Sequence, residues 1–146
     1  VLDEIPFISV TKVRDNCTHS YYAHPLKYNS ELSNGIHRNK FIEAVQAELP
    51  NTLLREDSAT LLGYGYVKPL YLLPMYQAKI AFGKEGYPFS LSKNTNYEMG
   101  LCPVTEDMHY NKLITHEFMR PGMSKKDLSD VCGAFEKVWS NMNELC

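Results

Sequence analysis

The chain has 146 residues, which is enough for a single domain with one hydrophobic core. Apolar residues make up 44% and charged residues 22%, as in ordinary globular proteins, and no apolar run approaches the roughly 18 residues of a membrane span. The net charge of −2 gives no general attraction to nucleic acid or acidic lipid, so we expect neither as a partner.

The four cysteines are too few and too widely spaced for a disulfide scaffold. They are Cys17, Cys102, Cys132 and Cys146. We expect free thiols in a reducing compartment, which indicates the cytoplasm. Cys102 and His109 do not have the spacing of a zinc motif, so we expect no metal site. The chain begins at Val1 rather than Met, which suggests an excerpt or a processed product.

The first part of the chain predicts one strand and one helix. Residues 1–16 mix apolar and charged side chains and indicate an extended lead-in. Tyrosine and leucine favour a strand over residues 18–28, and Pro25 predicts that this strand is an edge or is broken there. After a turn, apolar residues recurring every four positions predict a helix over residues 38–49.

The middle of the chain is less regular. Residues 52–62 show no clear period, and residues 63–73 indicate a turn and then a short strand containing Pro69. Pro74 is suited to open a short helix. Residues 83–97 carry glycine, proline and many small polar side chains, which predicts an exposed and mobile loop.

The last part of the chain has the clearest local signals. Pro103 predicts a short helix to about residue 111, and residues 114–119 indicate a strand. Ser124 and Asp127 have the spacing of a capping box. The apolar stripe that follows predicts a helix of about four turns; it consists of Leu128, Val131, Phe135, Val138 and Met142.

Short strands that do not alternate strictly with helices argue against a doubly wound parallel sheet. The sequence therefore predicts an α+β fold, with a small antiparallel or mixed sheet and helices packed on one face. We expect one domain over residues 1–146.

No residue pattern by itself marks a catalytic centre. His19 and His24 are five positions apart, so on a strand they would point to opposite faces and could not pair. The sequence has no GxSxG, and Gly63-Tyr64-Gly65 is not a nucleotide-binding fingerprint. The ten tyrosines are better explained as half-buried strand formers than as ligand contacts.

Three segments, taken in order, resemble the small C-terminal domain of the DegT/DnrJ/StrS family of pyridoxal-phosphate-dependent sugar aminotransferases. They are residues 35–44 (GIHRNKFIEA), residues 68–76 (KPLYLLPMY), and residues 102–107 (CPVTED) with 120–128 (RPGMSKKDL). The second is similar to the family's Pro-Leu-His-Leu-Gln-Pro-x-Tyr stretch. The third is similar to its Pro-Val-x-Glu helix and Pro-Gly-Met-Thr ending. The resemblance covers roughly residues 18–140.

The resemblance implies the C-terminal domain of an enzyme that transfers an amino group from an amino acid to a nucleotide-linked keto sugar. In such an enzyme a lysine holds pyridoxal phosphate as a Schiff base. That lysine lies in the family's large N-terminal domain, and none of the eleven lysines here stands in its motif. The chain alone is therefore expected to be inactive and to bind no cofactor. The implied partners are its own large domain, a second copy in a homodimer and a sugar nucleotide.

The resemblance also suggests substrate contacts at Tyr66, Lys68, Tyr71 and Arg120. Tyr71 stands at the family's histidine and Leu73 at its glutamine, while Arg120 replaces a tyrosine. Arg120 could bind a phosphate or carboxylate, although a solvated charge at a strand end is the stronger interpretation.

Two other hypotheses stay open. The chain could be a stand-alone, non-catalytic binding module with the same fold, or an unrelated hydrolase using cysteine or histidine. If it is part of a larger enzyme, we expect exposed apolar surface around residues 70–73 and self-association.

Overall fold

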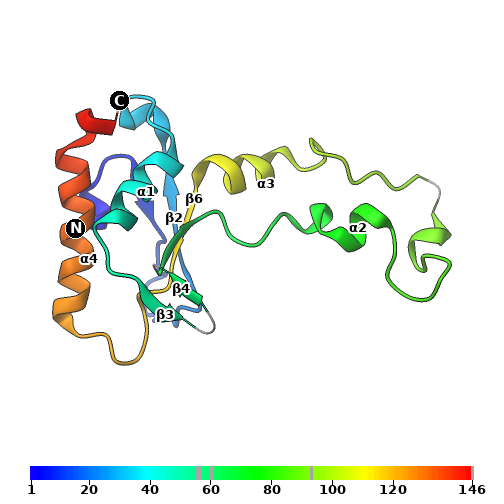
Figure 1. The fold of residues 1–146 in the computed structure, drawn as a ribbon, viewed down its shortest axis with the longest axis horizontal. Helices are drawn as coiled ribbons and strands as arrows, with labels where there is room; N and C mark the ends of the chain where they lie inside the picture. Colours follow the sequence, from blue (N-terminus) through cyan, green and yellow to red (C-terminus); the bar gives the residue numbers. More distant parts are fainter. Residues whose placement is uncertain (55–56, 60, 93, 146) are drawn as a thin grey trace.

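The computed structural model describes residues 1–54, 57–59, 61–92 and 94–145. A body built from both ends of the chain carries an arm, residues 66–107, which extends far to one side (Figure 1). The body holds one antiparallel sheet with the strand order β1-β2-β6-β5. These strands are β1 (Ile8–Val10), β2 (His24–Tyr28), β6 (Leu113–His116) and β5 (Leu62–Tyr64).

Two helices complete the core of the body. The helix α1 (Arg38–Ala47) contacts β5 and also α4 (Lys125–Ser140). Both contribute to one apolar cluster with the inward side of the sheet, where Leu26 and Tyr28 of β2 are buried. Pro25 and Lys27, on the other side of β2, are exposed. This arrangement confirms the predicted α+β class with a small antiparallel sheet.

The structure confirms the helices predicted over residues 38–49 and after Ser124. They could be predicted because their sequence signals are local. Phe41, Ile42 and Val45 of α1 are fully buried, as their spacing predicted, although α1 ends at Ala47 instead of residue 49. At α4, the Ser124 side chain accepts from the Asp127 N–H, and the Asp127 carboxylate accepts from the Ser124 N–H. This reciprocal pair satisfies two N–H groups that the helix itself leaves open.

The expectation for Pro25 was wrong in part, because β2 is a central strand that runs through Pro25. Pro25 pairs with Thr115 of β6 on one side, while β1 has already ended on the other, where Val10 pairs with Leu26. The Pro25 carbonyl accepts the Thr11 hydroxyl on that open side. The N–H and C=O of one residue point to the same side of an antiparallel strand, so the missing donor breaks no ladder bond. The predicted strand also began too early, since residues 18–23 lie outside it.

Several strands are missing from the sequence-based prediction. The lead-in contains β1 and places Ile5, Phe7 and Ile8 in the core. Residues 52–62, which show no period, contain the hairpin of β3 (Thr52–Leu54) and β4 (Asp57–Ala59) and the start of β5. The strand expected within residues 63–73 is wrong, because β5 ends at Tyr64 and the chain then leaves the body. Strands of three residues are too short to show a period of two.

The arm has short helices joined by extended chain. They are η3 (Leu70–Leu72), α2 (Pro74–Ala78), η4 (Phe89–Leu91), α3 (Pro103–Asp107) and the π-helical turn η5 (Met108–Lys112) at its root. The helices predicted at Pro74 and Pro103 are confirmed. Residues 83–97 are largely exposed, as expected, although they include η4.

The described residues contain neither a long apolar helix nor a cluster of metal-ligating side chains. No helix among them has the length and hydrophobicity to cross a bilayer, and they contain no cluster of three metal-ligating side chains. Cys17, Cys102 and Cys132 are free thiols, as predicted; Cys146 lies outside the described residues.

Ser124→Ala should lower the free energy of unfolding by about 1 kcal/mol, because the substitution removes the cap of the Asp127 N–H. Urea denaturation followed by circular dichroism measures this loss. Ser129→Ala, at an exposed position inside α4, is the control and should change stability by less than about 0.5 kcal/mol. Equal losses in both variants would show that the capping box does not contribute.

Candidate functional site

The root of the arm is held by a buried arginine at the first position of α1. Arg38 is only 2% exposed. Its Nη1 donates to the carbonyls of His109 and Leu113 at 2.8 and 2.7 Å, and its Nη2 to the carbonyl of Tyr110 at 2.7 Å. The guanidinium also donates to the Asn39 side chain and lies 5.4 Å from the centre of the Tyr64 ring.

In each of these hydrogen bonds the acceptor is an uncharged oxygen, either a backbone carbonyl or the Asn39 amide. The carbonyls of residues 109 and 110 belong to η5, at the carboxyl end of the α3–η5 helical segment. The last carbonyls of a helix lack intrahelical partners and carry partial negative charge. Burial lowers the pKa of Arg38, although the guanidinium stays charged at any ordinary pH. A buried positive charge therefore fixes where the arm returns to the body.

Gly65 brings the outgoing chain against the same segment. Its N–H donates to the Leu113 carbonyl at 2.6 Å, and its carbonyl accepts the Thr115 hydroxyl at 2.8 Å. Gly65 has φ +70°, and a Cβ there would lie 3.0 Å from the His109 carbonyl oxygen. Only glycine allows this approach without strain, so the two ends of the arm are joined closely.

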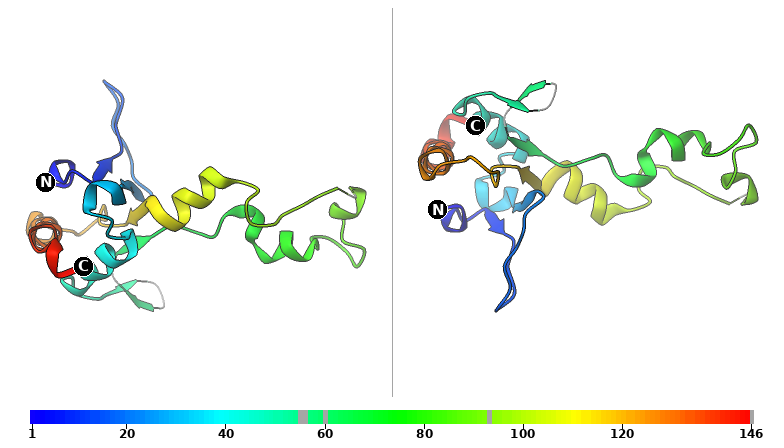
Figure 2. Two further views of the ribbon diagram at one scale, coloured as in Figure 1. Left: turned by 90° about the horizontal axis from the view of Figure 1, so that it is seen from above. Right: turned by 90° about the horizontal axis from the view of Figure 1, so that it is seen from below.

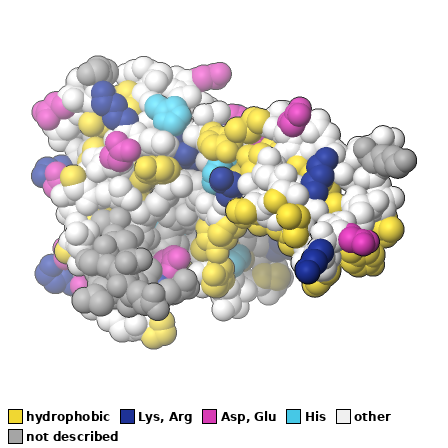
Figure 3. All heavy atoms as spheres, turned by 45° about the vertical axis from the view of Figure 1, so that its right-hand side comes forward, with side chains coloured by type: hydrophobic (Ala, Val, Ile, Leu, Met, Phe, Trp, Pro, Cys, Tyr) yellow, Lys and Arg dark blue, Asp and Glu magenta, His cyan; other side chains and the backbone are white. Residues whose placement is uncertain are grey.

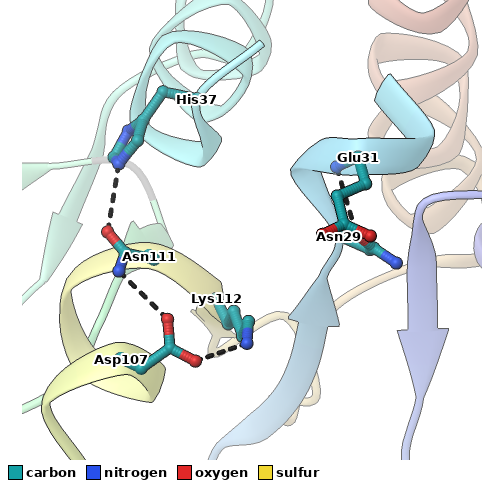
Figure 4. Close-up of polar contacts among 6 residues, drawn as sticks. All are labelled: Asn29, Glu31, His37, Asp107, Asn111 and Lys112. Atoms are coloured by element: carbon teal, nitrogen blue, oxygen red, sulfur yellow. Dashed lines mark hydrogen bonds and ion pairs between the residues drawn. The ribbon is translucent and has the colours of Figure 1, made fainter. Parts of the chain in front are cut away.

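A second chain of polar contacts leads from the start of α1 to η5 (Figure 4). His37 caps α1, because its Nδ1 accepts from the Asn39 N–H at 3.2 Å. Its Nε2 must therefore carry the proton, and it faces Asn111 Oδ1 at 3.5 Å. The Asn111 amide donates to Asp107 at 3.0 Å, and Lys112 forms an ion pair with Asp107, which lowers the pKa of that carboxyl. Both ring nitrogens of His37 are engaged, so it acts as a connector and not as a free base.

A separate cap shown in the same view belongs to the body. The Asn29 side chain accepts from the Glu31 N–H at 3.1 Å and begins η2 (Ser30–Ser33) after β2 (Figure 4). The turn that follows leads directly to His37 and Arg38. It therefore helps to place the start of α1.

Further along the arm, a buried tyrosine joins its two sides. Tyr71 of η3 is 7% exposed, and its hydroxyl donates to Glu106 of α3. The same carboxylate accepts the Gly100 N–H at 2.7 Å and the Cys102 N–H at 3.3 Å. Burial and the Glu106 carboxylate raise the pKa of Tyr71 to about 12, and the pKa of Glu106 is lowered mainly by the tyrosine hydrogen bond. Tyr71 therefore remains a neutral donor.

Aromatic and polar contacts support the outer half of the arm. The rings of Tyr76, Phe89 and Tyr97 pack edge to face at 5.3 to 5.9 Å between centroids. Gln77 donates to the carbonyls of Tyr71 and Tyr97, and Lys79 donates to the carbonyl of Thr95. These bonds join residues 71–79 to residues 95–97, and neither segment contributes to the apolar core.

The structure brings three of the four predicted substrate residues onto one stretch of the arm. Tyr66 and Lys68 are exposed near its root, and Tyr71 follows them, although its hydroxyl is already bound to Glu106. Arg120 lies beyond the other end of β6. There it pairs with Glu117, and its Nε donates to the Glu117 carbonyl at 3.0 Å. Arg120 is therefore separate from the other three.

The arm root has a positive electrostatic character. The pKa of His109 is lowered by burial first, then by the charges of Arg38 and Lys68. A half-buried histidine that is neutral near pH 7, beside an exposed lysine and a buried arginine, suits the binding of an anionic group.

A hollow in the body lacks these features. It has a volume of about 240 Å³ and is mainly apolar, lined by residues including Leu61, Phe118 and Val131. Its carboxylates are already engaged, because Asp127 belongs to the capping box and Asp130 pairs with Lys126. We therefore regard the arm root as the stronger candidate site.

Sequence reasoning missed the residues that organise this site. Arg38 lies outside the four-residue apolar spacing of its helix, which predicts an exposed side chain, and Glu106 has no spacing that marks an acid–base pair. The bonds that join them to other elements carry no local signal, because the Leu113 carbonyl lies 75 positions from Arg38 and Tyr71 lies 35 positions from Glu106. No model of a known protein family and no characterised protein sequence matches the chain.

Arg38→Met should reduce the free energy of unfolding by about 3 kcal/mol, because it keeps the apolar stem but leaves buried carbonyls without donors. Chemical denaturation measures the loss, and amide exchange over residues 108–113 should accelerate more than that of α4. Lys40→Met, exposed on the same helix, is the control and should change little. A loss in Arg38→Met no larger than in the control would contradict the assigned role.

Proposed function

We propose that this chain is the C-terminal small domain of a pyridoxal-phosphate-dependent aminotransferase of the DegT/DnrJ/StrS type. The complete enzyme would transfer an amino group from an amino acid to a nucleotide-linked keto sugar in the cytoplasm. The proposal includes three partners: the chain's own N-terminal large domain, a second copy of the enzyme and the sugar-nucleotide substrate. The chain alone does not catalyse the reaction.

The observation that carries the proposal is that the segments behind the resemblance contact one another. Arg38, from residues 35–44, binds the helical turn that directly follows residues 102–107. Tyr71, from residues 68–76, donates to Glu106 in residues 102–107. Residues 68–76 therefore contact residues 102–107 directly, and residues 35–44 contact the turn that follows them, as expected if these parts derive from one functional surface. Residues 120–128 lie beyond β6 and take no part in these contacts.

The surface of the arm supports the proposed partners. None of its described residues belongs to the apolar cluster of the body, yet most of the exposed large apolar side chains of the described residues lie on it. They include Val67, Leu70, Phe82, Leu91 and Val104, and Figure 3 shows hydrophobic side chains gathered over the arm. Ordering the arm costs conformational entropy, and the small apolar area that the arm buries by itself offsets little of that cost. A large domain or a second copy packed against it would supply that burial.

The lysines of this chain do not fit a Schiff-base role. All the described lysines are exposed except Lys112, which is half-buried and paired with Asp107. A lysine that acts as a nucleophile near neutral pH is normally desolvated so that its pKa falls. The proposal therefore assigns the cofactor to the large domain, and no step of the reaction is assigned to a lysine here.

The alternative function is a stand-alone, non-catalytic binding module with the same fold. The observation that favours it is the change of two polar family positions, to Tyr71, whose hydroxyl is used internally, and to Leu73. In this case the arm root would still bind an anionic ligand through Tyr66 and Lys68, without a neighbouring catalytic domain.

Titration with pyridoxal phosphate tests the assignment of the chemistry. We expect no shifted absorbance band and no lysine adduct after borohydride reduction, because no described lysine is desolvated. A stable internal aldimine would overturn the assignment of this chain as a small domain only. Sequencing the transcript upstream of the Val1 codon separates the two functions. An open frame with a Schiff-base lysine domain supports the enzyme, whereas a start codon directly before Val1 supports the module.

The apolar arm should make the isolated chain self-associate. Sedimentation equilibrium should show a mass that increases with concentration, and Leu70→Ser with Phe82→Ser should restore the monomer. Leu32→Ser, at an exposed leucine of the body, is the matched control and should leave association unchanged. A clean wild-type monomer at high concentration would count against the arm as a surface for a second copy.

A further inference from the structure

Two buried histidines face each other in the sheet, away from the arm. His24 on β2 and His116 on β6 are directly opposite in the strand register. Their rings are buried, at 9% and 5% exposure, and His24 Nδ1 lies 2.7 Å from His116 Nε2. This distance requires a hydrogen bond in which one ring donates and the other accepts.

The second nitrogen of His116 determines which ring donates. Among the described residues, His116 Nδ1 is buried with no hydrogen-bond partner. A buried N–H without an acceptor is rarer in proteins than an acceptor without a donor. His116 therefore carries its proton on Nε2 and donates to His24, while its Nδ1 is a bare lone pair inside the protein.

Among the residues that the structure describes, no group around the pair compensates a positive charge. His24 on β2 acts on His116 as a like charge and lowers its pKa. His19, in the loop before β2, acts on His24 in the same way. The Phe118 ring packs on His116, and β5 contributes Leu62 opposite it. The neighbouring carboxylate, Glu117, is paired with Arg120.

Burial, then the charge of His24, lowers the pKa of His116 to about 4. Burial, then His19, also lowers the pKa of His24. Both rings are therefore neutral at pH 7 in the closed structure. If that end of the sheet opens, His116 returns toward its ordinary pKa of 6.5.

The pair also anchors a loop, residues 11–23, which joins β1 to β2. The loop projects from the body in a direction of its own (Figure 2), and no residue in it belongs to the apolar core. It returns to the sheet through Tyr21, whose ring packs against His24 at 4.6 Å and stacks on His19 at 4.0 Å. The Thr11 hydroxyl also joins this loop to β2, because it donates to the Pro25 carbonyl.

We propose that the His24–His116 contact is a proton-operated latch. With both rings neutral, it holds residues 11–23 and the adjacent ends of β2 and β6 closed. A proton on His116 Nδ1 places an uncompensated charge beside His24, so this end of the sheet opens and releases the loop. The inference does not depend on the proposed enzyme function.

The sign of the pH dependence follows from the two states. The open state binds a proton at about pH 6.5, while the closed state resists it until about pH 4. The latch is therefore fully stabilising above pH 6.5. Within this window the open fraction rises by about tenfold for each unit that the pH falls, because opening takes up one proton.

Hydrogen exchange measured by mass spectrometry at pH 7 and pH 5 tests the latch, with rates corrected for intrinsic exchange. Protection of the ordered amides around residues 24 and 114–116 should fall by at least tenfold at pH 5, while α4 stays protected. His116→Gln keeps a donor near the position of Nε2 but cannot titrate, and it should lose this pH dependence. His37→Asn, which keeps a helix cap at an exposed histidine, should retain it.

The inference is overturned if wild-type protection is equal at the two pH values, or if His116→Gln keeps the wild-type dependence. If His116→Gln does not fold, nuclear magnetic resonance titration of the wild-type histidines decides instead. A His116 pKa near 4 supports the latch, and a value of 6.5 or above excludes it.

Discussion

The arrangement of this protein depends on the burial of one positive charge. Arg38 cannot lose its proton at physiological pH and is shielded from water. Its guanidinium therefore needs hydrogen-bond acceptors from the protein itself. The carbonyls of His109, Tyr110 and Leu113 supply them. These carbonyls lie where the arm ends and β6 begins. By binding them, the Arg38 side chain on α1 fixes both the end of the arm and the start of a central strand.

This constraint divides the molecule into parts with different sources of stability. The body has a shared apolar core of sheet, α1 and α4. The arm instead depends on individual bonds, such as that from Tyr71 to Glu106, and on the packing of Tyr76, Phe89 and Tyr97. Directional bonds can hold a shape but remove little apolar area from water. The arm therefore keeps a defined form while its apolar side chains remain available to another surface.

The same division explains which features the sequence predicts. The helices α1 and α4 are stabilised by neighbours three and four positions apart, and the capping box spans only Ser124 to Asp127, so their signals are local. The short strands β1 and β5 are defined by pairing with distant strands, β3 and β4 pair with each other, and three residues cannot show a period of two. The site is still less predictable: His24 and His116 are 92 positions apart, and the role of Arg38 appears only when η5 is placed against it.

The contacts within the arm also bear on how the proposed substrate could be recognised. In the proposed resemblance Tyr71 would stand at a histidine position, but its hydroxyl is buried against Glu106 and its pKa of about 12 keeps it protonated. It therefore holds η3 to α3 and does not replace the histidine as a ligand contact. Tyr66 and Lys68 precede it on the exposed side of the root, where burial, and then the charges of Arg38 and Lys68, lower the pKa of His109. If an anionic sugar nucleotide binds this domain, its phosphates are attracted to that root, and the distant Arg120 is not required.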